Sequence, residues 1–297
     1  MIHLPVFPDF APMEKDFRPL LHPHLSLLPD GVSEFTFAGL YLFRAQYRYR
    51  VCTAPAPHTP SSHALIISGE KDGEAFFMTP CAAPPGEILD ELFRTHVCWK
   101  NIPVSVWDGA AETIARHNIT VTPDRDNFDY LYRRTDLAEL AGKKYHKKRN
   151  LVNSFTLAYE ARRERLTGER AADALRVLDR WRAGRSGAGD YDAAAEALAL
   201  APELNLRGAV WYINGRAAAW CLGESLARGR AFAIHFEKGI DEYKGIYQYM
   251  NQDFAASLPV WYRHINREQD LGDEGLRQAK MTYRPAGFVE KYTGRKN

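Results

Sequence analysis

The hydrophobic and polar positions form their clearest pattern in the second half of the chain. Two apolar runs, Ala209–Ile213 and Ala217–Glu224, flank the short segment Asn214-Gly215-Arg216. An Asn-Gly pair between apolar runs predicts a β-hairpin, because both residues tolerate positive φ. The next run, Ala231–Glu237, alternates in polarity. This alternation predicts a strand that places the polar residues His235 and Glu237 together on one face.

Beyond this strand the apolar spacing changes from two residues to four. Apolar side chains recur at every fourth position from Ile246 onward, which predicts a helix from about Lys244 to Leu258. The remaining expected elements are a strand at Tyr262–Glu268, a helix at Asp273–Tyr283 and a last strand at Ala286–Tyr292. The predicted order is therefore βββ-α-β-α-β.

The first half repeats this order with unrelated residues. Its three expected strands are Tyr49–Thr53, Ala64–Ser68 and Ala75–Thr79. They are followed by a helix at Gly86–Val97, a strand at Ile102–Trp107, a short helix at Ala110–His117 and a closing strand at Asn127–Tyr132. Further helices are expected ahead of the strands, at Glu34–Phe43, Ala171–Arg182 and Asp192–Leu200. Two copies of one plan predict an α/β (α+β) protein with mixed sheets flanked by helices, divided into residues 1–135 and 136–297.

The segment Asp136–Phe155, which opens the second predicted domain, has the periodicity of a single linker helix. Asp136 and Glu139 have the spacing of a capping box. Gly142 weakens such a helix by about 1 kcal/mol relative to alanine. Opposite the apolar face lies a basic stretch, Lys143–Asn150, which is the first candidate for a functional surface.

Composition narrows the class of protein. Apolar residues make up 45% and charged residues 26%, which is typical of a folded chain, and 39 Lys and Arg stand against 37 Asp and Glu. Any basic surface must therefore be local. The four cysteines form no CxxC pair, so no metal site is expected. No run approaches the ~18 apolar residues of a membrane span and no signal peptide precedes the fold, so we expect a cytoplasmic protein.

Three stretches resemble a known family. They are Ser33-Glu-Phe-Thr-Phe-Ala-Gly-Leu-Tyr41, Gly142-Lys-Lys-Tyr-His-Lys-Lys-Arg-Asn150 and His264-Ile-Asn-Arg-Glu-Gln-Asp-Leu-Gly272, the last continued by Gly275–Lys280. The chain resembles bacterial proteins grouped with the C-terminal domain of phosphatidylglycerol lysyltransferase. This resemblance implies two tandem GNAT-like acyltransferase domains. It also implies a relation to the peptidoglycan-bridge aminoacyltransferases, which take amino acids from charged tRNA.

Two departures from related enzymes bear on the substrates. The membrane lysyltransferases carry transmembrane helices ahead of this domain, and this sequence contains none, which weakens the case for a lipid acceptor. GNAT enzymes that bind CoA hold its pyrophosphate in a glycine-rich loop at a helix N-terminus. The equivalent segment here, Glu237–Gly245, contains Asp241 and Glu242, whose charges oppose a pyrophosphate.

The basic stretch is the first candidate for substrate binding. A helical stripe of cations can neutralise successive phosphates of RNA or of another phosphorylated donor. The alternative is a solvated helix face with no ligand. The residues assigned to donor binding are Lys143, Lys144, His146, Lys147, Arg149 and Asn150, and Lys148 lies in the same run.

Polar residues on two predicted strands are the second candidate. His235 can act as a general base for an amine nucleophile, with Glu237 orienting it, or it can be a half-buried histidine satisfied by a neighbour. Asn266 and Glu268 alternate onto one face of the next strand. Glu268 and Asp270 can bind the ammonium group of an amino acid and Asn266 a carbonyl group, or these residues can form an ion-pair network with nearby arginines. Lys280 and Tyr283 are expected to complete this site.

These observations favour a transferase that moves an acyl group, here an aminoacyl group from tRNA, onto an amine or hydroxyl. His235, Glu237, Asn266 and Glu268 are its expected catalytic residues. No cofactor is required, since charged tRNA or acyl-CoA would be the donor substrate. Two alternatives remain: an acyl-CoA-dependent N-acetyltransferase, and a non-catalytic module that binds nucleic acid or another ligand.

Overall fold

The structure is a computed structural model, which describes residues 3–55, 63–185 and 189–297. It divides into two compact units that are both discontinuous in sequence. The first unit consists of Met1–Asp129, Gln269–Gly272 and Val289–Asn297, and the second of Tyr130–Glu268 and Asp273–Phe288. The sequence pattern instead predicted contiguous domains, residues 1–135 and 136–297.

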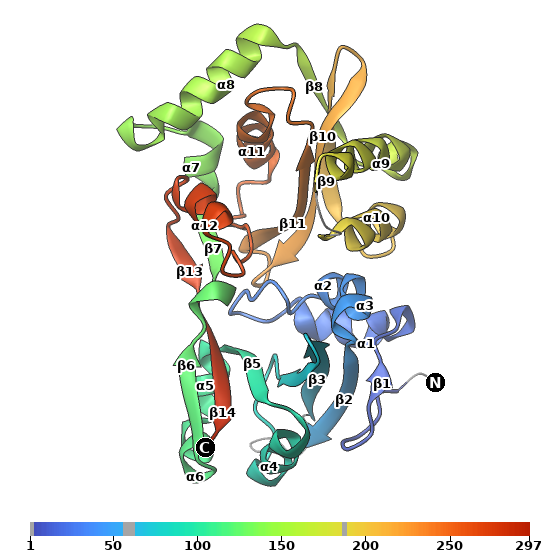
Figure 1. The fold of residues 1–297 in the computed structure, drawn as a ribbon, viewed down its shortest axis with the longest axis vertical. Helices are drawn as coiled ribbons and strands as arrows, with labels where there is room; N and C mark the ends of the chain where they lie inside the picture. The colour runs from blue at the N-terminus through green and yellow to red at the C-terminus, as the bar shows by residue number, and fades with distance from the viewer. Residues whose placement is uncertain (1–2, 56–62, 186–188) are drawn as a thin grey trace. The chain divides into compact units, whose positions relative to one another are not determined.

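The first unit is built on a mixed sheet, whose seven strands among the described residues are shown in Figure 1. In order across the sheet they are β1 (Ala11–Pro12), β2 (Arg50–Pro55), β3 (His63–Lys71), β4 (Glu74–Met78), β5 (Cys98–Pro103), β14 (Lys291–Lys296) and β6 (Ile119–Pro123). Its helices are η1 (Lys15–Phe17), α1 (Arg18–Leu25), α2 (Phe37–Leu42), α3 (Arg44–Tyr47), α4 (Gly86–Thr95), α5 (Val104–Gly109), α6 (Ala111–Arg116) and η2 (Arg125–Asn127). Apolar side chains of α4, α5 and α6 pack with Phe77 and Trp99 of the sheet to form its core.

The second unit has a sheet of the same size in the described part of the chain. Its strands, in order, are β13 (Gly287–Val289), β7 (Asp129–Arg133), β12 (His264–Asn266), β11 (Ala231–Gly239), β10 (Arg216–Leu226), β9 (Arg207–Ile213) and β8 (Ala161–Arg165). Its helices are α7 (Arg134–Glu139), η3 (Lys143–Tyr145), α8 (His146–Ala158), α9 (Gly168–Ala183), α10 (Tyr191–Leu200), α11 (Ile246–Ser257) and α12 (Glu274–Met281). Figure 1 shows α9 and α10 on one face of this sheet and α11 on the other.

The sequence pattern predicted most of these elements but placed two strands in the wrong sheet. The predicted strand Asn127–Tyr132 was assigned to the first half, yet β7 pairs with β12 of the second sheet. The predicted strand Ala286–Tyr292 divides into β13 and β14, and β14 inserts between β5 and β6 of the first sheet. Hydrophobic alternation identifies a strand but carries no information about which sheet receives it.

Three local predictions were also wrong. Val104–Trp107, predicted as the end of a strand, forms α5 after Pro103. The predicted linker helix is interrupted, because Leu140 and Gly142 both have positive φ and separate α7 from α8. Its predicted capping box does not form either, since the N-cap of α7 is Arg133.

In residues 3–55, 63–185 and 189–297, none of the helices combines the length and the hydropathy needed to cross a bilayer.

Candidate functional site

Two strands separate in the middle of the second sheet. The parallel strands β11 and β12 pair only at Ala231–His264, Phe232–Ile265 and Ala233–Asn266. From Ile234 to Gly239, β11 continues without β12 beside it. In the first sheet the parallel pair β4 and β5 is similarly short. Such a separation gives side chains access to the space between two strands.

A β-bulge lies in β11 at this point. In the ladder with β10, Ile234 and Phe236 pair with consecutive residues, so His235 has no residue opposite it. A bulge breaks the alternation of a strand and redirects its side chains. The alternation that predicted a common face for His235 and Glu237 is therefore interrupted, and the two residues contact different partners.

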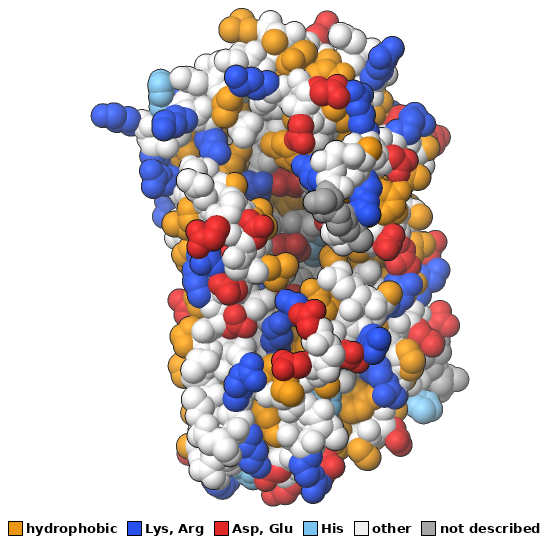
Figure 2. All heavy atoms as spheres, viewed as in Figure 1, with side chains coloured by type: hydrophobic (Ala, Val, Ile, Leu, Met, Phe, Trp, Pro, Cys, Tyr) orange, Lys and Arg blue, Asp and Glu red, His pale blue; other side chains and the backbone are white. Residues whose placement is uncertain are grey.

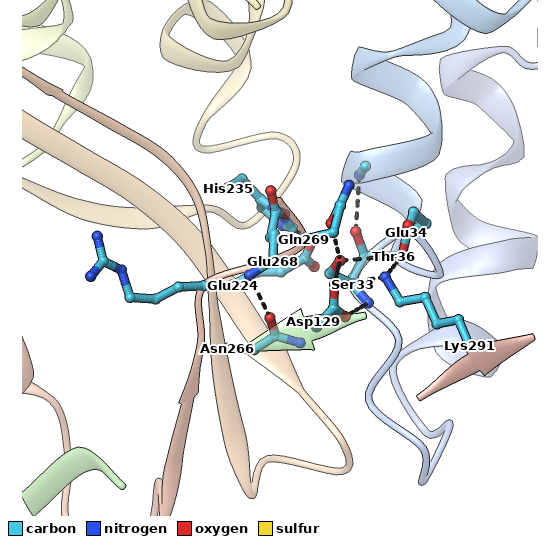
Figure 3. Close-up of polar contacts among 12 residues, drawn as sticks. Ser33, Glu34, Thr36, Asp129, Glu224, His235, Asn266, Glu268, Gln269 and Lys291 are labelled. Carbon is cyan, nitrogen blue, oxygen red and sulfur yellow. Dashed lines mark hydrogen bonds and ion pairs between the residues drawn. The ribbon is translucent and has the colours of Figure 1, made fainter. Parts of the chain in front are cut away.

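His235 lies between two carboxylates of the second unit, as Figure 3 shows. Its Nδ1 is 2.7 Å from Oε1 of Glu268, and its Nε2 is 3.0 Å from Oε1 of Glu224. Carboxylates accept, so both ring nitrogens donate and the imidazole is doubly protonated. Burial by itself lowers the pKa of His235, but the hydrogen bonds and charges of Glu224 and Glu268 outweigh it and raise this pKa to about 10.

This His235 cluster, defined as Glu224, His235 and Glu268, carries two negative charges and one positive charge at neutral pH. A histidine that keeps its proton up to about pH 10 cannot accept another, so the general-base role expected of His235 does not fit its environment. The Glu268 side chain is 25% exposed, whereas those of His235 and Glu224 are nearly buried. The net negative charge of the cluster is therefore accessible to a ligand through Glu268.

Glu237 makes a separate ion pair with Arg267, which follows β12. Burial lowers the pKa of Arg267, but the charge of Glu237 more than compensates and raises it. The Arg267 guanidinium carbon lies 5.1 Å from the ring centre of Tyr283 and 5.9 Å from that of Tyr132. Glu237 thus neutralises a buried arginine rather than orienting His235.

Asn266 and Lys280 hold the turn that presents Glu268. The Asn266 side-chain oxygen accepts a hydrogen bond from the Glu268 backbone N–H at 2.7 Å. Lys280 Nζ donates to the carbonyl oxygens of Arg267 at 2.6 Å and Glu268 at 3.1 Å. Glu268 itself has a φ of 56°, in the left-handed region. Both residues are buried and act on the backbone, so their place in the site is that of positioning residues.

Asp270 lies apart from these residues, in the first compact unit. Its buried carboxylate accepts from the Gly272 backbone N–H at 2.9 Å and lies 3.4 Å from Arg125. These contacts explain its burial without a ligand. The sequence analysis grouped Asp270 with Glu268 as carboxylates that could bind an ammonium group, but the structure gives them different partners.

Some side chains of the basic stretch Lys143–Asn150 are available to a ligand, whereas others already contact a neighbouring residue. Lys143 and Lys147 are exposed and, within the described residues, their ammonium groups have no ion-pair or hydrogen-bond partner. Figure 2 shows Lys and Arg side chains gathered over α8. Lys144 pairs with Asp136 at 3.2 Å, and His146 lies 3.5 Å from Asn150.

Arg149 has a structural role instead of the expected ligand contact. Its guanidinium donates to the carbonyl oxygens of Leu140 and Gly142, which lie between α7 and α8. These are backbone groups that a broken helix leaves without partners. Arg149 therefore stabilises the break that the sequence analysis did not foresee.

Lys148 was not assigned to the site from sequence, although it lies in the basic stretch. It is half-buried on α8, and its Nζ is 4.0 Å from the ring centre of Tyr283. Burial, with a smaller contribution from the charge of Arg267, lowers the pKa of Lys148 to about 8. Tyr283 thus links Lys148 to Arg267. Its position in the sequence could have distinguished Lys148 from its neighbours, because in a helix that begins at His146 it does not share the exposed face of Lys147.

A second polar cluster lies within the first unit. Lys291 of β14 is fully buried and donates to Asp129 at 2.6 Å and to Glu34. Ser33 donates to Asp129 through both its hydroxyl and its backbone N–H, each at 2.8 Å (Figure 3). Burial lowers the pKa of Lys291, but the two carboxylates raise it overall. Because Lys291 and Asp129 are fully buried and both carboxylates contact the same lysine, we interpret this cluster as structural, and sequence reasoning missed it.

The family of the chain follows from a match over most of its length. Residues 25–294 match the model of the family described as phosphatidylglycerol lysyltransferase, C-terminal. The chain belongs to this family. The match confirms the resemblance carried by the stretches around Ser33, Lys143 and His264. A search of curated proteins finds no significant match.

Solved structures confirm the expected fold of two tandem GNAT-like domains. A conserved protein of unknown function from Bacteroides thetaiotaomicron is similar, with 26% identity and a TM-score of 0.84 over 99% of this chain and 100% of that one. L-PGS from Bacillus licheniformis has 14% identity and a TM-score of 0.56, covering 83% of this chain and 84% of its own. FemX has 8% identity and a TM-score of 0.56, covering 96% of each chain. At these identities the likeness to the last two structures shows a shared fold alone.

Proposed function

We propose that this family member is an aminoacyltransferase, which takes an aminoacyl group from charged tRNA and passes it to an amine or a hydroxyl. Family membership supports an acyl-transfer reaction. The observation that carries the choice of donor is the net negative charge of the His235 cluster. A simple acyl group offers this cluster nothing to bind, whereas an aminoacyl ester has a cationic α-ammonium group.

The expected binding mode follows from the geometry of that cluster. The α-ammonium group of the donor approaches Glu268, the most exposed of its three side chains. His235 holds Glu268 and Glu224 at fixed positions through both ring nitrogens, so little rearrangement is needed on binding. A charge-assisted hydrogen bond between ammonium and carboxylate then orients the ester.

The remainder of the donor is polyanionic and meets the basic stretch. Lys143 on η3 and Lys147 on α8 are exposed, their ammonium groups have no partner among the described residues, and they can neutralise two phosphates. Binding through phosphates is dependent on salt and independent of base sequence. These two lysines would therefore contribute affinity for tRNA, and Glu268 would contribute selectivity for its charged form.

The chemical step is a direct attack by the acceptor on the ester carbonyl carbon. A bond forms from the acceptor nitrogen or oxygen to this carbon, and the bond from the carbon to the ribose oxygen breaks. Lys148, whose pKa of about 8 leaves part of it neutral near pH 7.5, accepts the acceptor's proton and returns it to the departing ribose hydroxyl. His235 remains protonated throughout.

The segment ahead of α11 argues against acyl-CoA as the donor. Asp241 and Glu242 lie there, paired with Arg185 at 3.4 Å and with Arg180. The Gly239 backbone N–H donates to the Tyr247 hydroxyl at 3.1 Å, so it is already occupied. A pyrophosphate site needs free backbone N–H groups and no nearby carboxylates. Both requirements are poorly met.

Filter binding tests the proposal with bulk tRNA charged with labelled amino acids, with the same tRNA uncharged, and with acetyl-CoA. We expect charged tRNA to bind several-fold more tightly than uncharged tRNA, and Glu268→Gln to remove this difference because the clamping charge is lost. Lys143→Ala/Lys147→Ala should weaken both forms equally. Lys71→Ala/Arg216→Ala, which removes two exposed cations elsewhere, is the matched control.

Turnover is measured as loss of label from the tRNA in the presence of a model amine acceptor. Transfer that depends on Glu268 and Lys148 supports the aminoacyltransferase. Tight binding of acetyl-CoA with no preference for charged tRNA would instead support the N-acetyltransferase. Binding of charged tRNA with no transfer under any condition would support the non-catalytic module.

A further inference from the structure

A cavity of about 290 Å³ opens on the second unit at the edge of its sheet. Arginines of β8 and β9 line one side, and aromatic residues of β11, α11 and the segment after α11 line the other. The volume is close to the lower limit for pockets that bind small molecules, which is roughly 300 Å³. The cavity is therefore suited to one compact ligand.

The cationic side of this cavity carries uncompensated charge. Arg163 is paired with Asp253 at 3.1 Å, and Asp253 also accepts from the Trp211 indole N–H at 2.8 Å. Arg165 and Arg207 also line the cavity, and within the described part of the chain their guanidinium groups have no ion-pair or hydrogen-bond partner. Two guanidinium groups at one cavity attract an anion and match the geometry of a carboxylate or phosphate.

The opposite side is apolar and rigid. The ring centre of Phe232 lies 5.6 Å from that of Phe254 and 5.5 Å from that of Tyr262. All three side chains are buried in the core of the unit, which fixes their orientation. A ligand that fills this part of the cavity needs an apolar body, because the aromatic carbons offer it few hydrogen bonds.

None of the cavity residues belongs to the proposed transferase site. The free arginines come from β8 and β9, whereas His235 is on β11 and β10 lies between β9 and β11. The aminoacyl group of the proposed donor is cationic, and these arginines would repel it. A ligand that binds between these arginines would carry the opposite charge, which is negative.

We propose that this cavity is a binding site for a small anionic amphiphile, an alkyl or aryl phosphate or carboxylate. Its anionic group binds between Arg165 and Arg207, and its apolar body packs on Phe232, Phe254 and Tyr262. The proposal does not depend on the transferase activity, because it rests on other residues and on binding alone.

Calorimetry with the full chain tests it, using octyl phosphate as the probe. Inorganic phosphate lacks the apolar body and 1-octanol lacks the charge, so each should bind at least about tenfold more weakly than octyl phosphate. Arg165→Ala/Arg207→Ala should lower the affinity for octyl phosphate by at least about tenfold. Arg162→Ala/Arg216→Ala is the matched control: Arg162 is on β8 but pairs with Glu164, and neither residue lines the cavity.

A second readout locates the ligand even if a variant folds poorly. The indole N–H of Trp211 contacts Asp253, which contacts Arg163 of the cavity, so its NMR signal should shift on addition of octyl phosphate. Equal affinity in wild type and Arg165→Ala/Arg207→Ala, or no change in the Trp211 signal at saturation, would overturn the proposal. So would inorganic phosphate binding as tightly as octyl phosphate.

Discussion

At the scale of single residues, the chemistry of the second unit depends on neighbours more than on residue type. Burial lowers the pKa of both the buried His235 and the half-buried Lys148, yet overall the pKa of His235 rises to about 10 and that of Lys148 falls to about 8. Two carboxylates contact His235, whereas Lys148 has an aromatic ring and a nearby arginine. The residue expected to be a base is thus a fixed cation, and a residue left out of the expected site is the better proton acceptor.

The raised pKa of His235 predicts how stability changes with pH. In the unfolded chain His235 titrates near 6.5, so its contribution is complete below that pH and is lost as pH rises toward 10. His235→Gln should therefore lower the free energy of unfolding most at pH 6, and this loss should shrink by more than about 1 kcal/mol by pH 9.5. Urea denaturation at several pH values measures it.

His264→Gln is the control for that series. The pKa of His264 is lowered by burial and by nearby arginines, so its folded and unfolded forms are both neutral above pH 7.5. The effect of this substitution should stay constant from pH 7.5 to 9.5. A constant effect of His235→Gln over the same range would show that His235 is not held as a cation.

Lys148 predicts the pH dependence of transfer. If its neutral amine accepts the proton, the rate should rise with pH through about 8 and then level off. Lys148→Met should lower the rate constant by about 100-fold and remove this rise. Lys147→Met, its exposed neighbour, should weaken tRNA binding and leave the pH profile intact. An unchanged profile in Lys148→Met would exclude Lys148 as the base.

At the scale of elements, local sequence signals predicted local structure well. The Asn214-Gly215 signal gives the β9–β10 hairpin, with φ of 50° and 74° at these residues. The apolar side chains at every fourth position correctly predicted the helix α11. The bulge at His235 was not predictable, because it depends on pairing with β10 and leaves no mark in the alternation of β11. The same is true of the break before α8, where a leucine, Leu140, adopts positive φ.

Gly223 of β10 pairs with Ile234 beside the bulge, and we predict that no larger residue can replace it. A Cβ added at Gly223 would lie 1.9 Å from the Ala233 carbonyl oxygen, far closer than any van der Waals contact. Gly223→Ala should therefore cost at least about 2 kcal/mol of unfolding free energy and shift the NMR signals of His235. Gly109→Ala, where nothing lies within 4 Å, should change stability by less than about 0.5 kcal/mol. Similar urea midpoints for both variants would contradict this account.

At the scale of the whole molecule, the two halves repeat one plan but do not fold as two contiguous segments. Periodicity predicted both sets of strands and the α/β class, and residue composition predicted a folded chain. Neither indicated that the last strand, β14, belongs to the first sheet. The residue that marks this arrangement is Lys291, a lysine in an otherwise ordinary strand sequence, which is buried completely against Glu34 and Asp129. A buried lysine needs partners from distant sequence, and a single sequence does not identify them.

Lys291 therefore predicts that the C-terminus stabilises the first unit. Lys291→Met leaves the carboxylates of Glu34 and Asp129 buried without their cation, which should cost about 3–5 kcal/mol. Lys296→Met, on the same strand, removes a partly exposed ion pair with Asp90 and should cost less than about 1 kcal/mol. Burial raises the pKa of Glu34, so lowering the pH protonates Glu34 and relieves its repulsion with Asp129; the deficit of Lys291→Met should therefore shrink toward pH 4. Equal urea midpoints for the two variants at pH 7 would mean that β14 is held by its backbone pairing alone.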